Sequence, residues 1–238
     1  MMSSTVDISI IILFKQKDKK LQQALDSSKF AKEIITIENS LITNFSEVRN
    51  QALEKATYPW VFFLDSDEVI TPESIAEIKK IIVNNQADGI IINIQDIFYN
   101  QIIKHGEVGN MKLLRMGKKD KITWKRPVHE VAIINGVVEN SNIKIIHQAH
   151  SSISDFLTSV TSYAGIEAKY RDNYNKNPNI LQLIIFPIIK FIHNYLLKRG
   201  FLDGWRGFSY ALMMSLHSFS VRVFQYELKY QKNHAKNT

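Results

Sequence analysis

The stretch from Trp60 to Glu68 combines an apolar segment with acidic residues that could bind a metal ion. Residues 60–64 are apolar without interruption, and Asp65, Asp67 and Glu68 follow at once. The apolar run predicts a strand that is covered on both faces, as in the interior of a parallel sheet. Open α/β sheets bind their ligands at the carboxyl ends of such strands. Two hard oxygen ligands at this place suit Mg²⁺ or Mn²⁺ next to substrate phosphates.

We therefore predict a metal–diphosphate site at Asp65 and Asp67, because extended backbone would project both side chains to the same side. The alternative is an acidic loop that only solvates the start of the next helix, since exposed acidic residues are common in loops.

Strand and helix patterns alternate around this stretch. Apolar, β-branched runs predict strands at 8–14, 33–38 and 90–97 in addition to 60–64. A helix is predicted near 21–27, a second begins at a capping box formed by Asn44 and Glu47, and a third begins at Thr71 with Pro72 in its first position. The resulting β-α-β-α-β-α-β order predicts an α/β fold with a largely parallel central sheet.

The second half of the chain changes from β-rich to helical. Residues 112–116, 124–131 and 143–147 have strand character, and helices are predicted at 155–174 and from 208 to about 229. We divide the chain into an α/β domain at 1–150, which contains the predicted metal–diphosphate site, and a helical region at 151–238.

The segment 181–197 is strongly apolar but is broken by Pro187, Lys190 and His193, and it is shorter than the roughly 20 residues of a membrane span. Its basic and aromatic surroundings are typical of an interfacial membrane segment. The alternative is that these helices simply pack on the core, because periodicity alone does not separate a buried stripe from a lipid-facing one.

Composition narrows the possible partners. The chain has 238 residues, a net charge of +7, 45% hydrophobic residues and no cysteine, so disulfide and thiolate chemistry are excluded. The positive charge favours an anionic partner such as a phosphorylated substrate or an anionic membrane. The sequence contains no zinc-finger, RNA-binding or basic-zipper signature, so we expect no nucleic-acid partner. The N-terminus lacks the basic and apolar pattern of a signal peptide.

Several segments in sequence order resemble the family 2 glycosyltransferases of the GT-A fold. These are Asn44 to Leu53 (NFSEVRNQAL), Trp60 to Glu68, Val128-His129-Glu130, the region of Gly136, His147, and Gly200 to Gly207 (GFLDGWRG). Within the family they are most similar to the branch of lipopolysaccharide-core glucosyltransferases. The resemblance implies an inverting sugar transfer from a nucleotide diphosphate sugar, assisted by a divalent metal, to a lipid-linked or cell-envelope glycan. Together with the basic, aromatic helical C-terminus, it predicts a cytoplasmic protein at the inner face of the cytoplasmic membrane.

The resemblance assigns roles to individual residues. Asp65 would contact the nucleotide ribose or the metal, Arg49 would lie near the diphosphate, and Glu38 would stand where the family has an Asp facing the base. Asp67 would be the metal ligand, and His147 an additional contact to the metal or a phosphate. For His147 the alternative is a structural histidine held by hydrogen bonds.

Glu130 is the predicted general base. Inverting transfer needs a carboxylate that takes the proton of the acceptor hydroxyl while the sugar carbon is attacked from the opposite face. The alternative for Glu130 is a surface ion pair with Arg126 or Lys125.

Two loops depart from the family pattern. The Asp-Ser-x-Ser-Thr-Asp stretch after the second strand is replaced by 38–43 (ENSLIT), and the loop after the first strand reads Phe14 to Asp18 (FKQKD). Because both loops help to hold the nucleotide, a non-catalytic homologue, a binding scaffold and a metal-dependent nucleotidyltransferase remain alternatives. The last of these usually has a glycine-rich phosphate loop after the first strand, and 14–20 contains no glycine.

Overall fold

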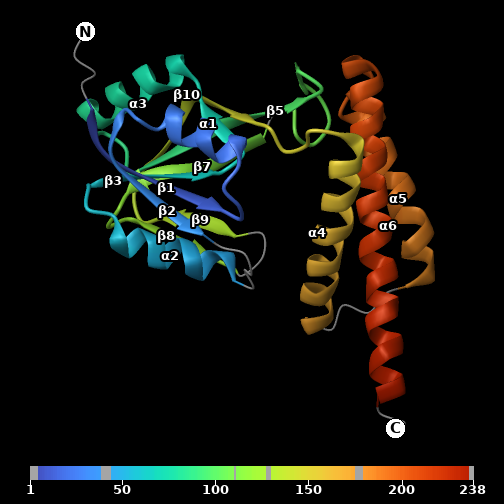
Figure 1. Cartoon of the computed structure of the whole chain (residues 1–238). Coiled ribbons are helices and arrows are strands. Elements are labelled where there is room, and N and C mark those ends of the chain that lie inside the picture. Colours follow the sequence, from blue (N-terminus) through green and yellow to red (C-terminus); the bar gives the residue numbers. More distant parts are fainter. Residues whose placement is uncertain (1–4, 39–43, 110, 127–129, 175–178, 236–238) are drawn as a thin grey trace. The chain divides into compact units, whose positions relative to one another are not determined.

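The computed structural model describes residues 5–38, 44–109, 111–126, 130–174 and 179–235 (Figure 1). The chain forms two compact units. Unit 1 contains Met1–Asp96 and Met111–Gln148, and unit 2 contains Ile97–Asn110 and Ala149–Thr238. The segment Ile97–Asn110 therefore groups with the C-terminal helices, although the division drawn from the sequence places it in the first domain.

Unit 1 is built on a mostly parallel sheet. The strands follow the order β2 (Ala31–Glu38), β1 (Val6–Phe14), β3 (Trp60–Asp65), β7 (Met111–Lys118), β5 (Gly89–Phe98), β10 (Val138–His147) and β4 (Glu68–Ile70). Parallel pairs join β1 to β2, β1 to β3, and β5 to β10. The strand β7 lies antiparallel between β3 and β5, and the short β4 lies antiparallel to β10. The predicted α/β class with a largely parallel sheet is confirmed.

Both faces of this sheet are covered. On one face, α1 (Lys19–Ser27) and α3 (Pro72–Asn84) pack Leu21, Ala24 and Ile78 against strand residues such as Ile10 and Phe62. On the other, α2 (Phe45–Lys55) and the hairpin of β8 (Ile122–Lys125) and β9 (Val131–Ile134) form a second core. The continuous apolar runs of β1 and β3 are explained by this burial on two sides.

The predicted helix starts are confirmed. The side chain of Asn44 accepts a hydrogen bond from the backbone N–H of Glu47 at 3.2 Å, and Thr71 caps α3 in the same way through Ser74, with Pro72 in the first turn. These caps satisfy N–H groups that have no partner inside the helix.

Unit 2 consists of three helices and the segment that follows β5. The helices are α4 (Ile153–Asn173), α5 (Ile180–Ile192) and α6 (Gly204–Ala235), with a π-helical turn η1 (His193–Leu197) and a 3₁₀ turn η2 (Gly200–Asp203) between the last two. Phe98 and Ile103 are buried against α4 and α6, where they contact Phe156, Tyr210 and Met213. The hairpin strand β6 (Gln101–Ile102) pairs with the end of β5.

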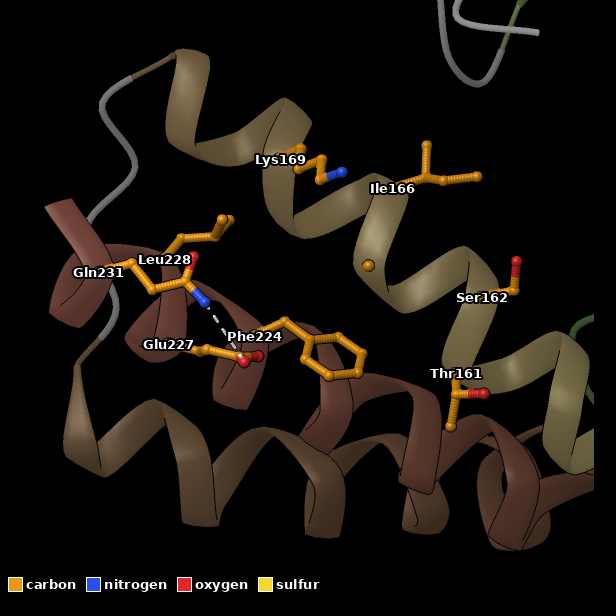
Figure 2. A pocket seen from close by; sticks show the side chains of 9 residues that line it. Thr161, Ser162, Ile166, Lys169, Phe224, Glu227, Leu228 and Gln231 are labelled. Atoms are coloured by element: carbon orange, nitrogen blue, oxygen red, sulfur yellow. Dashed lines mark hydrogen bonds between the residues drawn. The ribbon is translucent and has the colours of Figure 1, made fainter. Parts of the chain in front are cut away.

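An open groove of about 420 Å³ lies between α4 and α6 (Figure 2). It is lined by side chains such as Ile166, Lys169, Phe224 and Glu227, and none of the predicted site residues borders it.

Candidate active site

The predicted site residues gather at one edge of the sheet because the parallel strands all end there. In the register of the sheet, Leu13 lies next to Asp65, Phe14 next to Glu38, and His147 next to Asp96. Arg49 reaches this edge from α2, and Glu130 directly precedes β9. The carboxyl edge is where an open α/β sheet binds its ligands.

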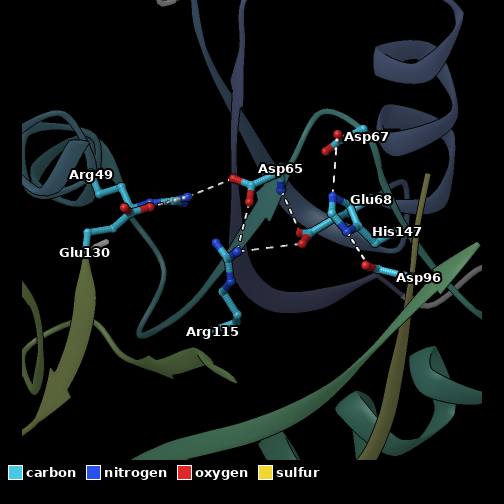
Figure 3. Close-up of polar contacts among 8 residues, drawn as sticks. All are labelled: Arg49, Asp65, Asp67, Glu68, Asp96, Arg115, Glu130 and His147. Atoms are coloured by element: carbon cyan, nitrogen blue, oxygen red, sulfur yellow. Dashed lines mark hydrogen bonds and ion pairs between the residues drawn. The ribbon is translucent and has the colours of Figure 1, made fainter. Parts of the chain in front are cut away.

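Asp65 is held between two arginine side chains (Figure 3). Its Oδ1 accepts a hydrogen bond from Arg49 Nη2 at 2.7 Å, and its Oδ2 accepts one from Arg115 Nη2 at 2.8 Å. Burial by itself would raise the pKa of the Asp65 carboxyl, but the charges of Arg115 and Arg49 hold that pKa well below its usual range. Asp65 is therefore ionised, with both oxygens engaged by protein donors.

Arg49 links Asp65 to Glu130. Its Nε donates to Glu130 Oε1 at 3.2 Å, while its Nη2 contacts Asp65. The guanidinium is buried and lies 4.6 Å from the centre of the Trp124 ring, and this cation–π contact fixes its plane. The alternative pairing of Glu130 with Arg126 or Lys125 is not found among the described ion pairs.

Glu68 lies buried next to this pair. Its Oε2 accepts from the backbone N–H of Asp65 at 2.8 Å, and its Oε1 lies 3.7 Å from Arg115 Nη2. Burial raises the pKa of Glu68 despite the opposing charge of Arg115, and the negative charge of Asp65 adds to the rise. Arg115 therefore contacts two carboxyl groups, those of Asp65 and Glu68, and the side chain of Glu68 is almost fully buried.

Asp67 and His147 form a second polar group, with Asp96 behind them (Figure 3). His147 Nε2 lies 3.5 Å from Asp67 Oδ2, and His147 Nδ1 bonds Asp96 Oδ1 at 2.6 Å. Burial lowers the pKa of His147, but the hydrogen bonds to Asp67 and Asp96 outweigh it and hold the pKa well above its usual value. His147 is therefore a cation here, and its Nε2 points toward Asp67.

Asp65 and Asp67 do not project to one side, which corrects the expectation of extended backbone. The strand ends at Asp65, the chain turns at Ser66 and Asp67, and β4 begins at Glu68. As a result Asp65 pairs with arginines and Asp67 with His147.

The remaining predictions concern Glu38, the altered loop at 39–43 and His129. Glu38 is exposed at the carboxyl end of β2, in the same edge of the sheet, and none of the hydrogen bonds or ion pairs described joins it to Asp65. The altered loop at 39–43 and the motif residue His129 lie outside the described residues.

Sequence reasoning missed Arg115 and Asp96. Arg115 stands within the apolar segment Met111 to Met116, where a charged residue in a buried strand already indicates a paired, constrained group. Asp96 follows the apolar part of β5, so it carries the same signal as Asp65: an acid at the carboxyl end of a strand.

Two buried arginine donor groups at this edge lack a partner within the described part of the chain. They are the Nη1 groups of Arg49 and Arg115. A buried N–H without an acceptor costs about 1–3 kcal/mol, so both groups are suited to a ligand that brings acceptor oxygens.

Comparison with known proteins identifies the family. The model of the family described as glycosyl transferase family 2 matches residues 10–134, more than half of the chain. The lipopolysaccharide core biosynthesis glycosyltransferase LpsC of Rhizobium meliloti (strain 1021) is 24% identical over 185 residues, which cover 73% of this chain and 67% of LpsC.

Solved structures of S. aureus TarS are also similar. TarS 1-349 in complex with UDP matches with a TM-score of 0.42 and 11% identity over 95% of this chain and 92% of that chain. A longer TarS structure matches with a TM-score of 0.39 and 11% identity over 72% of this chain, which spans only 43% of that one. The family match covers β1 to β9, with the sheet order and carboxyl-edge site described above. The chain belongs to glycosyltransferase family 2 and has the GT-A type of α/β fold.

Proposed function

We propose that this chain transfers a sugar, with inversion at the sugar carbon, from a nucleotide diphosphate sugar to a lipid-linked or cell-envelope glycan acceptor. The observation that carries the proposal is the bridge of Arg49 between Asp65 and Glu130 at the carboxyl edge of the sheet. Arg49 thereby joins Asp65, which is proposed to hold the donor, to Glu130, which is proposed to act on the acceptor.

Glu130 is proposed as the general base. An ionised carboxylate takes the proton from the acceptor hydroxyl as that oxygen attacks the sugar carbon, and the nucleoside diphosphate leaves from the opposite side. Arg49 fixes the carboxylate through Oε1 on a guanidinium that is itself held by Trp124. The base is thereby oriented before the acceptor arrives, which lowers the entropic cost of reaching a reactive geometry.

Arg49, Asp65 and Glu38 are proposed to bind the donor. The unpartnered Nη1 groups of Arg49 and Arg115 support an anionic ligand at this place, since diphosphate oxygens would accept from them. Asp65 would accept from a ribose hydroxyl, because the two arginines leave it ionised while neutralising its charge. Glu38 is exposed at the end of β2, where it is accessible to the base of the nucleotide.

Asp67 and His147 are proposed to hold Mg²⁺ or Mn²⁺. The donor set would fit such an ion once His147 gives up its Nε2 proton, because only a neutral imidazole binds a metal: one carboxylate, and an imidazole whose Nδ1 is held by Asp96 as in many metal-binding histidines. Among the described residues no group of three or more His, Cys, Asp or Glu side chains could hold a metal, so the remaining ligands would be donor phosphates and water. When bound, the metal would neutralise charge on the departing diphosphate.

The acceptor and the site of action are proposed from the chemistry of unit 2. The net charge of +7 and the basic and aromatic residues of the C-terminal helices support peripheral contact with the anionic inner face of the cytoplasmic membrane, where lipid-linked acceptors are found.

A thermal-shift titration tests the donor and the metal together. We expect nucleoside diphosphates to raise the unfolding temperature in the presence of Mn²⁺ and much less in its absence; a ligand at a hundredfold excess over its Kd stabilises by about 2.7 kcal/mol. Asp67→Asn should remove the metal dependence, whereas Asp120→Asn, an exposed carboxylate in a distant turn, should keep it. Stabilisation by triphosphates alone would favour a nucleotidyltransferase, and no response to any nucleotide would favour a non-catalytic scaffold.

A further inference from the structure

Helix α5 exposes its apolar side. Ile180, Ile184, Ile188 and Ile192 repeat every four residues, and Leu181, Ile185 and Ile189 form the neighbouring row, so the seven side chains make one continuous face. We call this the α5 apolar face. All seven are exposed, with Ile184 at 58% and Ile188 at 55%, and α5 contains no buried residue.

Two polar side chains of the same segment, Lys190 and Asn194, contact the rest of unit 2 instead. Lys190 Nζ bonds Glu107 Oε1 at 2.5 Å, and Asn194 in η1 accepts from the backbone N–H of Glu107 at 2.9 Å. Ser215 of α6 donates to the carbonyl oxygen of Pro187 at 2.7 Å. The helix is therefore reversed relative to one on a water-soluble protein, which turns its apolar stripe to the core and its polar residues to solvent.

The reversed orientation of the helix explains how Pro187, Lys190 and His193 can interrupt the apolar run. They lie on the side of the segment that faces the rest of unit 2, so they leave the exposed side uninterrupted. By length and composition, Ile180–Leu197 is also apolar enough to cross a membrane, with a mean hydropathy of 1.7 and only 6% of its residues buried. A core helix with this composition would be mostly buried.

The surroundings of the face indicate what covers it. Lys198 and Arg199 are exposed directly after the segment that ends at Leu197, followed by the exposed aromatic side chains of Phe201, Trp205 and Phe208. An aliphatic face bordered by aromatic residues and cations is the composition of helices at a bilayer surface. Contacts between protein copies instead concentrate aromatic residues in their centre. Lys and Arg also outnumber Asp and Glu in residues 149–238, which complements an anionic surface.

We propose that the α5 apolar face inserts into the acyl region of an anionic bilayer, with α5 lying in the plane of the membrane and Lys198 and Arg199 at the level of the lipid headgroups. The in-plane orientation follows from the polar side, because Lys190 and Asn194 keep their contacts to Glu107 only if that side remains covered by protein. This insertion rests on the membrane contact proposed above and gives it a surface and a depth, but it does not depend on the transfer reaction, because its test needs no donor sugar.

The absence of cysteine allows a direct test by site-specific labelling. Ile184→Cys and Ile188→Cys would carry an environment-sensitive fluorophore, and Gln182→Cys, on the other side of the same helix, serves as the matched control. With vesicles of phosphatidylcholine and phosphatidylglycerol in equal amounts, we expect a blue shift at 184 and 188 and quenching by lipids brominated in their acyl chains. The label at 182 should show neither.

A flotation assay with the unlabelled protein separates lipid from a second copy of the chain. Each of Ile184→Asp and Ile188→Asp should lower the affinity for these vesicles at least tenfold, because a charge in the acyl region is unfavourable by more than 1.4 kcal/mol. Val83→Asp adds the same charge at an apolar residue of unit 1 that is 80% exposed, and it should leave binding unchanged.

Three results would overturn the proposal. Labels at 184 and 188 that remain unquenched would exclude insertion, and equal quenching at 182 would mean that lipid surrounds the helix on all sides, as in a span. A dimer in lipid-free buffer that Ile184→Asp converts to a monomer would assign the face to a second copy.

Discussion

Arg49 connects two carboxylates with different proposed tasks, so its own removal would not separate those tasks. Glu130 is the better residue for a test of the chemistry, because its described contacts to the site run through one oxygen and one arginine. Replacing a carboxylate by an amide keeps the shape of the side chain and removes the ability to take a proton.

We expect Glu130→Gln to lower kcat by about 10²–10⁴, the usual contribution of general-base catalysis, while the affinity for the nucleoside diphosphate changes little. Donor binding by isothermal titration and transfer by product detection measure the two effects. Glu139→Gln, an exposed glutamate in β10, is the matched control and should retain full activity. A fully active Glu130→Gln protein would remove Glu130 from the mechanism.

Arg115 is expected to matter for stability through Glu68. Arg115→Met keeps most of the volume of the side chain but leaves buried Glu68 without its cation and takes one of two arginines from Asp65, which should cost about 3 kcal/mol of unfolding free energy. Chemical unfolding monitored by circular dichroism measures this loss. The double variant Arg115→Met with Glu68→Gln should regain part of it, because the amide needs no counter-charge.

The loss of stability caused by Arg115→Met should also depend on pH. Burial raises the pKa of Glu68 in the folded protein, so the protonated form is favoured on folding, and this contribution is fully present below the unfolded pKa and is lost as the pH rises through the folded pKa. Without Arg115 the pKa of Glu68 rises further. The difference in stability between wild type and Arg115→Met should therefore shrink on acidification, and a difference that is constant with pH would contradict the charge argument.

At the scale of elements, helices and strands could be predicted where local chemistry determines them. The caps at Asn44 and Thr71 and the apolar run of β3 act through neighbouring residues, and the sequence indicates them correctly. The antiparallel position of β7 between β3 and β5 depends on contacts between residues far apart in the chain, so its apolar pattern does not reveal it. The turn at Ser66 and Asp67 was missed because a short β4 pairs with β10, a distant strand.

The segment Gly200 to Gly207 was recognised only as part of a resemblance, and the structure gives it a physical role. Asp203 Oδ2 accepts from the backbone N–H groups of Lys104 and His105 at 3.0 and 2.8 Å, which ties the 97–109 segment to the start of α6. A Cβ on Gly207 would lie 1.9 Å from the carbonyl oxygen of Gly200, a backbone atom that cannot move aside easily.

Gly207→Ala should therefore destabilise unit 2 by about 3 kcal/mol, at the upper end of overpacking effects. Gly165→Ala in α4 is the matched control, because its Cβ would meet only a Phe224 ring carbon at 4.0 Å. It should stabilise the helix by up to about 1 kcal/mol through helix propensity. Urea unfolding of both variants measures the difference, and equal stabilities would contradict the close packing of Gly200 and Gly207.

At the scale of the whole molecule, the division into two units is the feature that is hardest to predict from the sequence. The change from β-rich to helical composition near residue 150 is visible in the pattern, but 97–110 has no composition that assigns it to the helices. Its place in unit 2 results from the burial of Phe98 and Ile103 against side chains more than fifty residues later. Such an assignment depends on tertiary packing, which periodicity does not report.

This arrangement predicts how truncation affects the chain. A protein ending at Gln148 keeps the sheet and both of its cores, but it exposes Phe98 and Ile103, which in the full chain contact Phe156, Tyr210 and Met213. We expect this protein to bind the dye ANS and to aggregate, because exposed apolar clusters promote association. A second truncated protein, in which a short Gly-Ser linker replaces 97–109, should be soluble and bind little dye. If both proteins are soluble and bind little dye, 97–109 does not depend on the helices, and the boundary near residue 150 is the physical one.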